Sequence, residues 1–429
     1  MASSSLLATH IGAGTGIGKT ILTHTHPVGT MLPAWQHVFY WTARSCVEDR
    51  MKPSEEFHIP SLDGIRGLAA LMVFLSHAAL PNLIPGGFGV TIFFFLSGYL
   101  ITTLLRREYA STGAISLRNF YLRRVYRILP PLYIVLATCV ILDLAGVFNS
   151  DMSVRGVVAQ AVQMTNYYII AFGQGGLAPA TSIMWSLAVE EHFYLLFPLA
   201  LSLLYRRFDV HRIAGILLSV CGVVLLWRAF MVFAVGYGHD YTYFATDTRL
   251  DSLLFGCILG VWSNPALDRT ERTPSKLTWL ALLVISFAVL LLTFVIRSES
   301  FREVFRYSLQ GIAMFSIFFC AVRFHHWPAF RWLESRPMRA LGLISYTFYL
   351  VHVPCLELLR TYADLGKWPR TAVAFVLTVA VSTAMYYLVE RRMAALRRRL
   401  HGRKKRPLSI SEPTESGPAT EAGEKLSLS

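Results

Sequence analysis

The sequence predicts an all-α fold, a polytopic helical bundle that is integral to a membrane. Charged residues make up only 15% of the 429 residues, whereas hydrophobic residues make up 54%. A soluble globular chain carries roughly 25% charged residues. The apolar residues are also gathered into long runs, each close to the length of about 20 residues that a helix needs to cross a bilayer. Charge is therefore too scarce, and apolar sequence too continuous, for a soluble domain.

Ten apolar segments have the length and composition of membrane-spanning helices. They lie at residues 62–80, 87–105, 128–147, 184–204, 213–235, 248–264, 277–296, 307–324, 340–359 and 371–389. An eleventh segment, residues 154–172, is weaker because Gln160, Gln163 and Asn166 lie inside it. We expect this segment to be interfacial or re-entrant, so that the chain crosses the membrane about ten times.

Clusters of basic residues set the expected orientation, because loops on the cytoplasmic side are enriched in Lys and Arg. The loop after the second span, residues 106–127, is strongly basic, and so is the segment after the last span, residues 391–406. If 154–172 does not cross, these two stretches and the basic residues 205–212 all fall on one side. The sequence thus predicts that both termini are cytoplasmic and that the protein resides in the cell membrane.

Three parts of the chain differ in composition. Residues 1–58 are a poorly patterned N-terminal extension, residues 59–390 form the membrane domain, and residues 391–429 combine a basic juxtamembrane segment with a disordered tail. The extension contains a Gly-Lys-Thr sequence at 18–20 that resembles a phosphate loop. No buried strand precedes it and Pro27 ends any helix that follows, so we interpret the match as accidental.

The net charge of +14 raises the question of an acidic partner. Nine basic residues are concentrated in 391–406, directly after an apolar segment, which is the pattern of a segment that touches anionic lipid. This placement favours membrane lipid as the partner and argues against nucleic acid. The six cysteines are scattered with no paired spacing, so we expect neither a disulfide framework nor a metal site.

Three polar side chains lie within the first predicted span, where ionisable groups are costly and tend to mark function. Asp63 and Arg66 are one turn apart, and His77 lies eleven positions after Arg66, so all three share one helix face. The face runs from a charged pair near the inner edge to an imidazole about 16 Å further along the axis. The alternative interpretation is an interfacial ion pair together with a hydrogen-bonded packing histidine.

Two further spans carry candidate residues. In the fourth span, Glu190 lies in a stripe with Ser186 and Tyr194 at i,i+4 spacing. The alternative for Glu190 is a structural carboxylate that pairs with an arginine to tie helices together. In the ninth span, His352 lies in the middle with Tyr349 one turn earlier, although a lone histidine at such a position is more often a packing residue.

Three arginines, Arg123, Arg124 and Arg127, lie where the cytoplasmic loop enters the third span. The guanidinium fork suits phosphate oxygens, which it binds in bidentate fashion. The pattern is therefore typical of a phosphate-binding cluster, and the alternative is a set of ordinary positive-inside anchors.

Five stretches, in order and at these spacings, resemble the membrane acyltransferase type 3 family, whose members O-acylate sugars and cell-envelope polymers. They are "LDGIRGLAALMVFLSH", "GVTIFFFLSGYLI", "FYLRRVYRILP", "WSLAVEEHFYLLFPL" and "SYTFYLVHVP". The resemblance covers residues 60–390. It implies an O-acetyltransferase-like enzyme that moves an acyl group from cytoplasmic acyl-CoA, with acetyl-CoA expected, to a hydroxyl of a carbohydrate or glycosylated acceptor. It implies no bound cofactor.

The family's functional residues can be placed on matching positions of this chain. Its first-span pair of arginine and histidine matches Arg66 and His77. Its arginine pair before the third span matches Arg124 and Arg127, and its span-start glutamate matches Glu190. The resemblance thus assigns functional roles to the same residues that the polar pattern singles out.

We expect His77 to act as the general base on the acceptor hydroxyl, because a neutral imidazole titrates near the working pH. Covalent passage of the acyl group through His77 is an open alternative. Glu190 would orient His77 or bind acceptor hydroxyls, and Arg66 would lie on the donor side. The remaining candidates for contact with substrate are Asp63, Arg123, Arg124, Arg127, Tyr349 and His352.

A rival class is a secondary transporter, which would also place Arg, His and Glu side chains inside the membrane. That class predicts inverted repeats and paired interrupted helices, and the sequence has no such symmetry. One departure from the family pattern is His192, which stands where a glutamine is usual. The sequence leaves the oligomeric state open.

Overall fold

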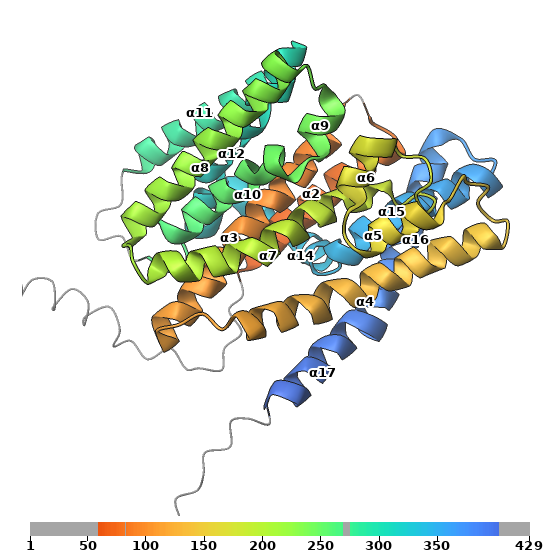
Figure 1. Ribbon diagram of the computed structural model, residues 1–429, viewed down its shortest axis with the longest axis horizontal. Coiled ribbons are helices and arrows are strands. Elements are labelled where there is room, and N and C mark those ends of the chain that lie inside the picture. The colour runs from red at the N-terminus through yellow and green to blue at the C-terminus, as the bar shows by residue number, and fades with distance from the viewer. Residues whose placement is uncertain (1–58, 82, 269–274, 403–429) are drawn as a thin grey trace, which may run out of the picture. The chain divides into compact units, whose positions relative to one another are not determined.

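A computed structural model describes residues 59–81, 83–268 and 275–402, and within these residues the chain forms helices and no strands (Figure 1). The predicted all-α class is therefore confirmed. The N-terminal extension with its Gly-Lys-Thr sequence, and the predicted tail beyond residue 402, lie outside the described residues.

The longer helices belong to two groups along the chain. Those of the first half are α2 (Pro60–Ala78), α3 (Gly86–Thr112), α4 (Leu117–Leu144), α7 (Trp185–Tyr205) and α8 (Val210–Phe230). Those of the second half are α10 (Thr246–Val261), α11 (Lys276–Val295), α12 (Arg306–Arg323), α15 (Ser345–Tyr362), α16 (Lys367–Met385) and α17 (Arg391–Gly402). In Figure 1, α2, α3 and α10 lie centrally, with α8, α11 and α12 on one side and α15 and α16 on the other.

Short helices and turns connect the longer ones. The short α-helices are α5 (Val154–Ala161), α6 (Thr165–Phe172), α9 (His239–Phe244), α13 (Pro328–Arg331) and α14 (Arg336–Leu343). The single turns of 3₁₀ or π type are η1 (Ser182–Met184), η2 (Met231–Val235), η3 (Phe301–Phe305), η4 (Trp332–Glu334) and η5 (Tyr386–Glu390).

The described helices confirm a multi-pass membrane protein. Seven helical stretches are long and apolar enough to cross a membrane, and an eighth qualifies if α14 and α15, which meet at 78°, form one bent span. The predicted spans 62–80 and 248–264 are helical as α2 and α10, but they do not meet this test. α10 has only 16 residues and nearly all of them are buried inside the bundle, so its surroundings are protein rather than lipid. The number of ten crossings and the cytoplasmic termini stay predictions.

The weak segment 154–172 is two short helices rather than one. α5 and α6 have eight residues each, about 12 Å of helix, and the chain turns between them at Gln163, which has a positive φ of 61°. Neither helix alone can cross a hydrocarbon core about 30 Å thick. The buried Gln160 accepts a hydrogen bond from the N–H of Ala178 at 3.0 Å and donates to Thr181 Oγ1 at 2.6 Å. Its polar side chain is thus satisfied by protein groups.

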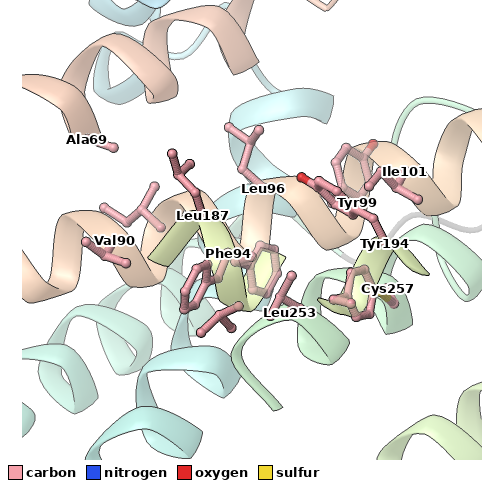
Figure 2. Close-up of a cluster of buried hydrophobic side chains, with 14 of the residues drawn as sticks. Ala69, Val90, Phe94, Leu96, Tyr99, Ile101, Leu187, Tyr194, Leu253 and Cys257 are labelled. Atoms are coloured by element: carbon pink, nitrogen blue, oxygen red, sulfur yellow. The ribbon is translucent and has the colours of Figure 1, made fainter. Parts of the chain in front are cut away.

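Glycines let α3 and α10 approach each other until their backbones touch. A Cβ added to Gly98 would lie 2.0 Å from the carbonyl oxygen of Leu253, and one added to Gly256 would lie 1.9 Å from that of Phe95. Figure 2 shows buried side chains of α3, α7 and α10, including Phe94, Leu187 and Leu253, gathered around this contact. Close backbone packing of this kind replaces the hydrophobic driving force that lipid cannot supply.

A buried ion pair joins α8 to α10. Arg228 and Asp251 are both fully buried, and their side chains meet at 2.9 Å. Arg228 also donates to the carbonyl oxygen of Val304 at 2.8 Å and to Ser308 Oγ at 2.6 Å, so the pair reaches η3 and α12 as well. Ser308 in turn donates to Asp251 at 2.6 Å, and these hydrogen bonds offset part of the cost of holding two charges away from water.

The glycine contact yields a prediction about stability. Gly256→Ala should strongly destabilise the protein, because its Cβ would collide with the backbone oxygen of Phe95, which cannot move aside like a flexible side chain; overpacking costs about 1–3 kcal/mol or more. The matched control is Gly222→Ala on α8, where an added Cβ meets nothing within 4 Å. Thermal unfolding of the detergent-purified protein measures both. Equal midpoints for the two variants would show that the contact is not tight.

The orientation yields a second prediction. A cysteine at Arg207, between α7 and α8, should react with an impermeant thiol reagent only after the cells are opened, whereas a cysteine at Ser298, after α11, should react in intact cells. The native thiols at the described positions are all buried, so a Cys46→Ser background suffices. Labelling of position 207 from outside would reverse the predicted topology.

Candidate active site

The predicted polar face of the first span exists and lies on α2. Arg66 and His77 are eleven residues apart on this continuous helix, close to three full turns, which places them on one face about 16 Å apart. Asp63 pairs with Arg66 at 3.4 Å. The candidate residues divide into one group around His77 and another around Arg66.

His77 meets His352, which α15 presents. The Nδ1 atom of His77 lies 3.4 Å from Nε2 of His352, and the two rings pack edge to face with centroids 5.1 Å apart. His352 is fully buried, whereas His77 is exposed at the end of its helix. The structure thus brings together two histidines that the sequence separates by 275 residues.

Backbone carbonyls assign the protons of both rings. His77 Nδ1 lies 2.9 Å from the carbonyl oxygen of Val73, and His352 Nδ1 lies 2.6 Å from that of Tyr349. A carbonyl oxygen only accepts hydrogen bonds, so in each neutral ring Nδ1 carries the proton. His352 Nε2 therefore offers its lone pair to the Nδ1–H of His77. The Nε2 of His77 has no hydrogen-bond partner among the described residues and keeps its own lone pair.

Arg360 holds the end of α2 in place, and sequence reasoning missed it. Its Nη2 donates to the carbonyl oxygen of His77 at 2.8 Å, and its Nη1 pairs with Glu357 at 3.3 Å. Arg360 lies two turns beyond His352 on α15, a spacing that could have linked it to the histidine. The same helix therefore supplies both the ring and the arginine that contact His77.

Tyr349 joins α15 to the start of α7. Its hydroxyl lies 2.8 Å from Ser186 Oγ and donates to the carbonyl oxygen of Ile183 at 3.1 Å. Its ring packs against that of His352, with centroids 5.6 Å apart. The phenol is buried and engaged by protein groups, so its direct effect is to fix the position of His352.

The group around Arg66 gathers arginines from two helices. Arg66 lies within the electrostatic field of Arg124 and Arg127, both on α4. The guanidinium of Arg124 lies over the ring of Tyr194, 4.8 Å from its centroid. Arg127 is exposed and forms no hydrogen bond with the described residues. Two of the three predicted phosphate ligands thus lie near the first-span arginine.

Glu190 belongs to this second group. It accepts a hydrogen bond from Tyr194 at 3.0 Å and lies in the field of Arg124, Arg66 and Arg127. We expected Glu190 to orient His77. In the structure, the ring of His352 contacts His77 instead.

Arg123 is directed to another partner. Its Nη2 forms an ion pair with Glu108 of α3 at 3.0 Å, and Arg123 is not among the charged residues that act on Arg66. Adjacent residues on a helix point about 100° apart, so Arg123 and Arg124 face different neighbours. Spacing alone could not show which of the two turns inward.

Two further carboxylates lie near the arginines, and sequence reasoning singled out neither of them as a site residue. Glu191 and Glu190 both lie in the field of Arg124. Glu390 of η5 accepts a hydrogen bond from Thr347 at 2.5 Å and lies in the field of Arg127. The second group is therefore a mixed cluster of cations and carboxylates rather than a purely basic patch.

A stripe along α7 links the two groups. Ser186 contacts Tyr349 beside His352, and Glu190 and Tyr194, one and two turns further along, lie beside the arginines. The sequence predicted this stripe from its i,i+4 spacing. Its role as the connection between the histidine pair and the arginines appears only in the folded chain.

Known proteins share this sequence over most of its length. Residues 59–387 match a family described as an acyltransferase domain. The O-acetyltransferase OatA of Staphylococcus aureus (strain NCTC 8325 / PS 47) is 31% identical over 345 residues, which are 78% of this chain and 57% of that protein. A putative O-acetyltransferase of S. aureus (strain COL) is 30% identical over 346 residues, with the same two shares.

The chain thus spans 57% of the length of these curated relatives. No solved structure matches it. The family match nevertheless covers the helices from α2 to α16, which carry every residue of the two groups except Glu390. The resemblance predicted from the five sequence stretches is confirmed, and the chain belongs to this acyltransferase family.

Proposed function

We propose that this protein transfers an acetyl group from cytoplasmic acetyl-CoA to a hydroxyl group of a carbohydrate-type acceptor, with His77 as the general base. The observation that carries the proposal is the histidine pair, in which two backbone carbonyls leave the Nε2 lone pair of His77 free. The relatives named as O-acetyltransferases support the choice of acyl group and of oxygen as the acceptor atom.

In the proposed reaction, His77 Nε2 removes the proton of the acceptor hydroxyl while its oxygen attacks the thioester carbonyl. A C–O bond forms, the C–S bond breaks, and the departing CoA thiolate takes up the proton that His77 removed, which returns His77 to its neutral form. As His77 becomes positive, its Nδ1–H hydrogen bonds to Val73 and His352 strengthen, because a charged donor binds acceptors more tightly. His352 acts as a positioning residue, since it contacts His77 and not the reacting atoms.

The arginines of the second group supply the donor site. Arg124 and Arg127 would bind phosphates of CoA, and Arg66, held by Asp63, would lie next to them. The pantetheine arm of CoA separates its phosphates from its thioester. A donor whose phosphates lie at the arginines can therefore present the thioester further along α2, toward His77.

The histidine pair yields a prediction that separates catalysis from packing. His77→Gln should fold and bind acetyl-CoA but lose transfer by about 10²-fold or more, because an amide cannot accept the proton. His352→Gln should lower kcat by about tenfold with the KM for acetyl-CoA unchanged, the loss of about one hydrogen bond to a charged group. Release of free CoA thiol in the presence of acceptor measures both.

The pH profile gives the matching control for this prediction. Transfer by the wild type should decline as pH falls, because a protonated His77 ring cannot act as base. The charged and titratable neighbours are His352 and Arg360, so His352→Gln should displace this decline, whereas a purely structural loss would scale the profile without moving it. Near-normal turnover of His77→Gln would refute the assignment.

The arginines yield a prediction about the donor. Arg127→Gln should raise the KM for acetyl-CoA by about tenfold or more, since a charge-assisted phosphate contact contributes about 1.5–3 kcal/mol. Arg127→Lys should restore part of this loss, because an ammonium cannot reproduce the guanidinium fork. Arg123→Gln is the matched control, because Arg123 pairs with Glu108 instead, and its KM should stay near the wild-type value. Equal KM values for Arg123→Gln and Arg127→Gln would remove the proposed donor site.

A further inference from the structure

A cavity of about 700 Å³ lies at the end of α2 that carries His77. Three connecting segments enclose it: the residues between α2 and α3, the short helix α9, and the stretch that joins α11 to α12. Its volume falls in the range of about 300–1,000 Å³ that is usual for ligand pockets. Neither the histidine pair nor the arginines of the donor site line this cavity.

Three arginine side chains line the cavity: Arg297 and Arg302 from the stretch between α11 and α12, and Arg306 from the first residue of α12. The side chains of Arg297 and Arg302 form no hydrogen bond or ion pair with the described residues. Arg306 donates to the hydroxyl of Tyr307 at 2.9 Å, but its buried Nε has no acceptor. These guanidinium groups therefore have donors to spare for a ligand.

The acidic residue nearest in sequence is already engaged. Glu303 is buried and accepts hydrogen bonds from His239, at 3.1 Å, and from Thr242. Its carboxylate ties η3 to α9 and is not part of the cavity wall. Glu303 lies in the electrostatic field of Arg306, and Glu299 belongs to the same stretch, but among the described residues neither forms an ion pair with any of the three arginines that line the cavity.

A further buried cation lies behind the wall. The guanidinium of the fully buried Arg249 lies 3.9 Å from the ring centroid of Tyr307 and 5.4 Å from that of Tyr243, and both of these rings line the cavity. Arg249 donates to Thr91 Oγ1 at 3.0 Å, while its Nε and Nη1 have no acceptor. A buried cation whose donors are unfilled makes the adjoining space favourable for negative charge.

The predicted topology places all three enclosing segments on the outer side of the membrane. Outer loops are depleted of Lys and Arg, so two arginines between α11 and α12 and a third at the first residue of α12 run against the usual bias. A charge pattern that opposes the topological rule needs a separate explanation, and binding of an anionic ligand from outside provides it.

We propose that this cavity binds an anionic group, a carboxylate or a phosphate, of the acetyl acceptor. The inference rests on the proposed function, because it takes the acceptor to react at His77. Ser76 lines the cavity and precedes His77 on α2, so the two side chains point about 100° apart. The cavity therefore holds a part of the acceptor beside the reacting hydroxyl, and it makes the enzyme selective for acidic glycans.

Binding of three oligosaccharides to the purified full-length protein tests the proposal. They share one backbone and are neutral, uronate-bearing or phosphorylated, and calorimetry in an uncharged detergent gives each Kd without competing lipid phosphate. We expect the wild type to bind one of the two charged sugars about tenfold or more tightly than the neutral one. The tighter of the two identifies the anionic group.

Variants assign the selectivity to the cavity. The double variant Arg302→Gln and Arg306→Gln should bind the charged sugar only as tightly as the neutral one. Arg155→Gln is the matched control, because Arg155 is also exposed and predicted to face outward but packs over Phe172. If the double variant fails to fold, the single variant Arg297→Gln, at an exposed position, takes its place and should reduce the preference.

Three results would overturn the proposal. The wild type could bind all three sugars with equal affinity, it could bind none of them, or the arginine variants could keep the preference for the charged sugar. A failure of this binding proposal can be told apart from a failure of the proposed catalytic function. His77→Gln should keep the preference for the charged sugar while it loses transfer. Normal transfer by His77→Gln would refute the catalytic proposal whatever the binding data show.

Discussion

The position of α2 within the bundle determines everything that the two groups of polar residues can do. Its backbone is clamped on one side by direct contact with η4 and α14: a Cβ on Gly64 would lie 2.0 Å from the carbonyl oxygen of Leu333, and one on Gly342 would lie 1.9 Å from that of Asp63. A Cβ on Gly89 of α3 would approach the oxygen of Ala69 to 2.9 Å. Since these are backbone contacts, α2 cannot shift or rotate without breaking them. Arg66 and His77 therefore keep a fixed separation and a common face.

A bilayer cannot hydrate charges, so the protein itself must surround them. The buried Arg228 and Asp251 satisfy each other and neighbouring backbone groups, and this arrangement needs no ligand. Arg249 differs, because aromatic rings surround it while two of its donor atoms are unfilled. The contrast between a completed pair and an uncompleted cation distinguishes a structural charge from one that faces a binding site.

Helical periodicity was sufficient to predict the polar face of α2 and the stripe on α7, because a spacing of three, four or eleven residues fixes direction on a helix. It could not predict which helices meet. His352 and His77 are brought together by packing between α15 and α2, which no local pattern encodes. Arg123 and Arg124 are neighbours in sequence, yet their partners are Glu108 and Tyr194, on different helices. The number of spans stays a prediction for a related reason: an interior helix such as α10 is shielded by protein and need not be long or wholly apolar.

The choice of a second histidine, rather than a carboxylate, as the partner of His77 follows from its surroundings. Position 352 is fully buried, and an unpaired carboxylate there would be strongly disfavoured. A neutral ring avoids that cost and still offers a lone pair to the Nδ1–H of His77. It also places no negative charge next to His77, so this contact does not favour the protonated ring before the reaction. The lone pair of His352 then stabilises His77 only as positive charge develops on its ring during proton transfer. An interaction that strengthens in the transition state lowers the activation barrier, whereas one already present in the ground state does not.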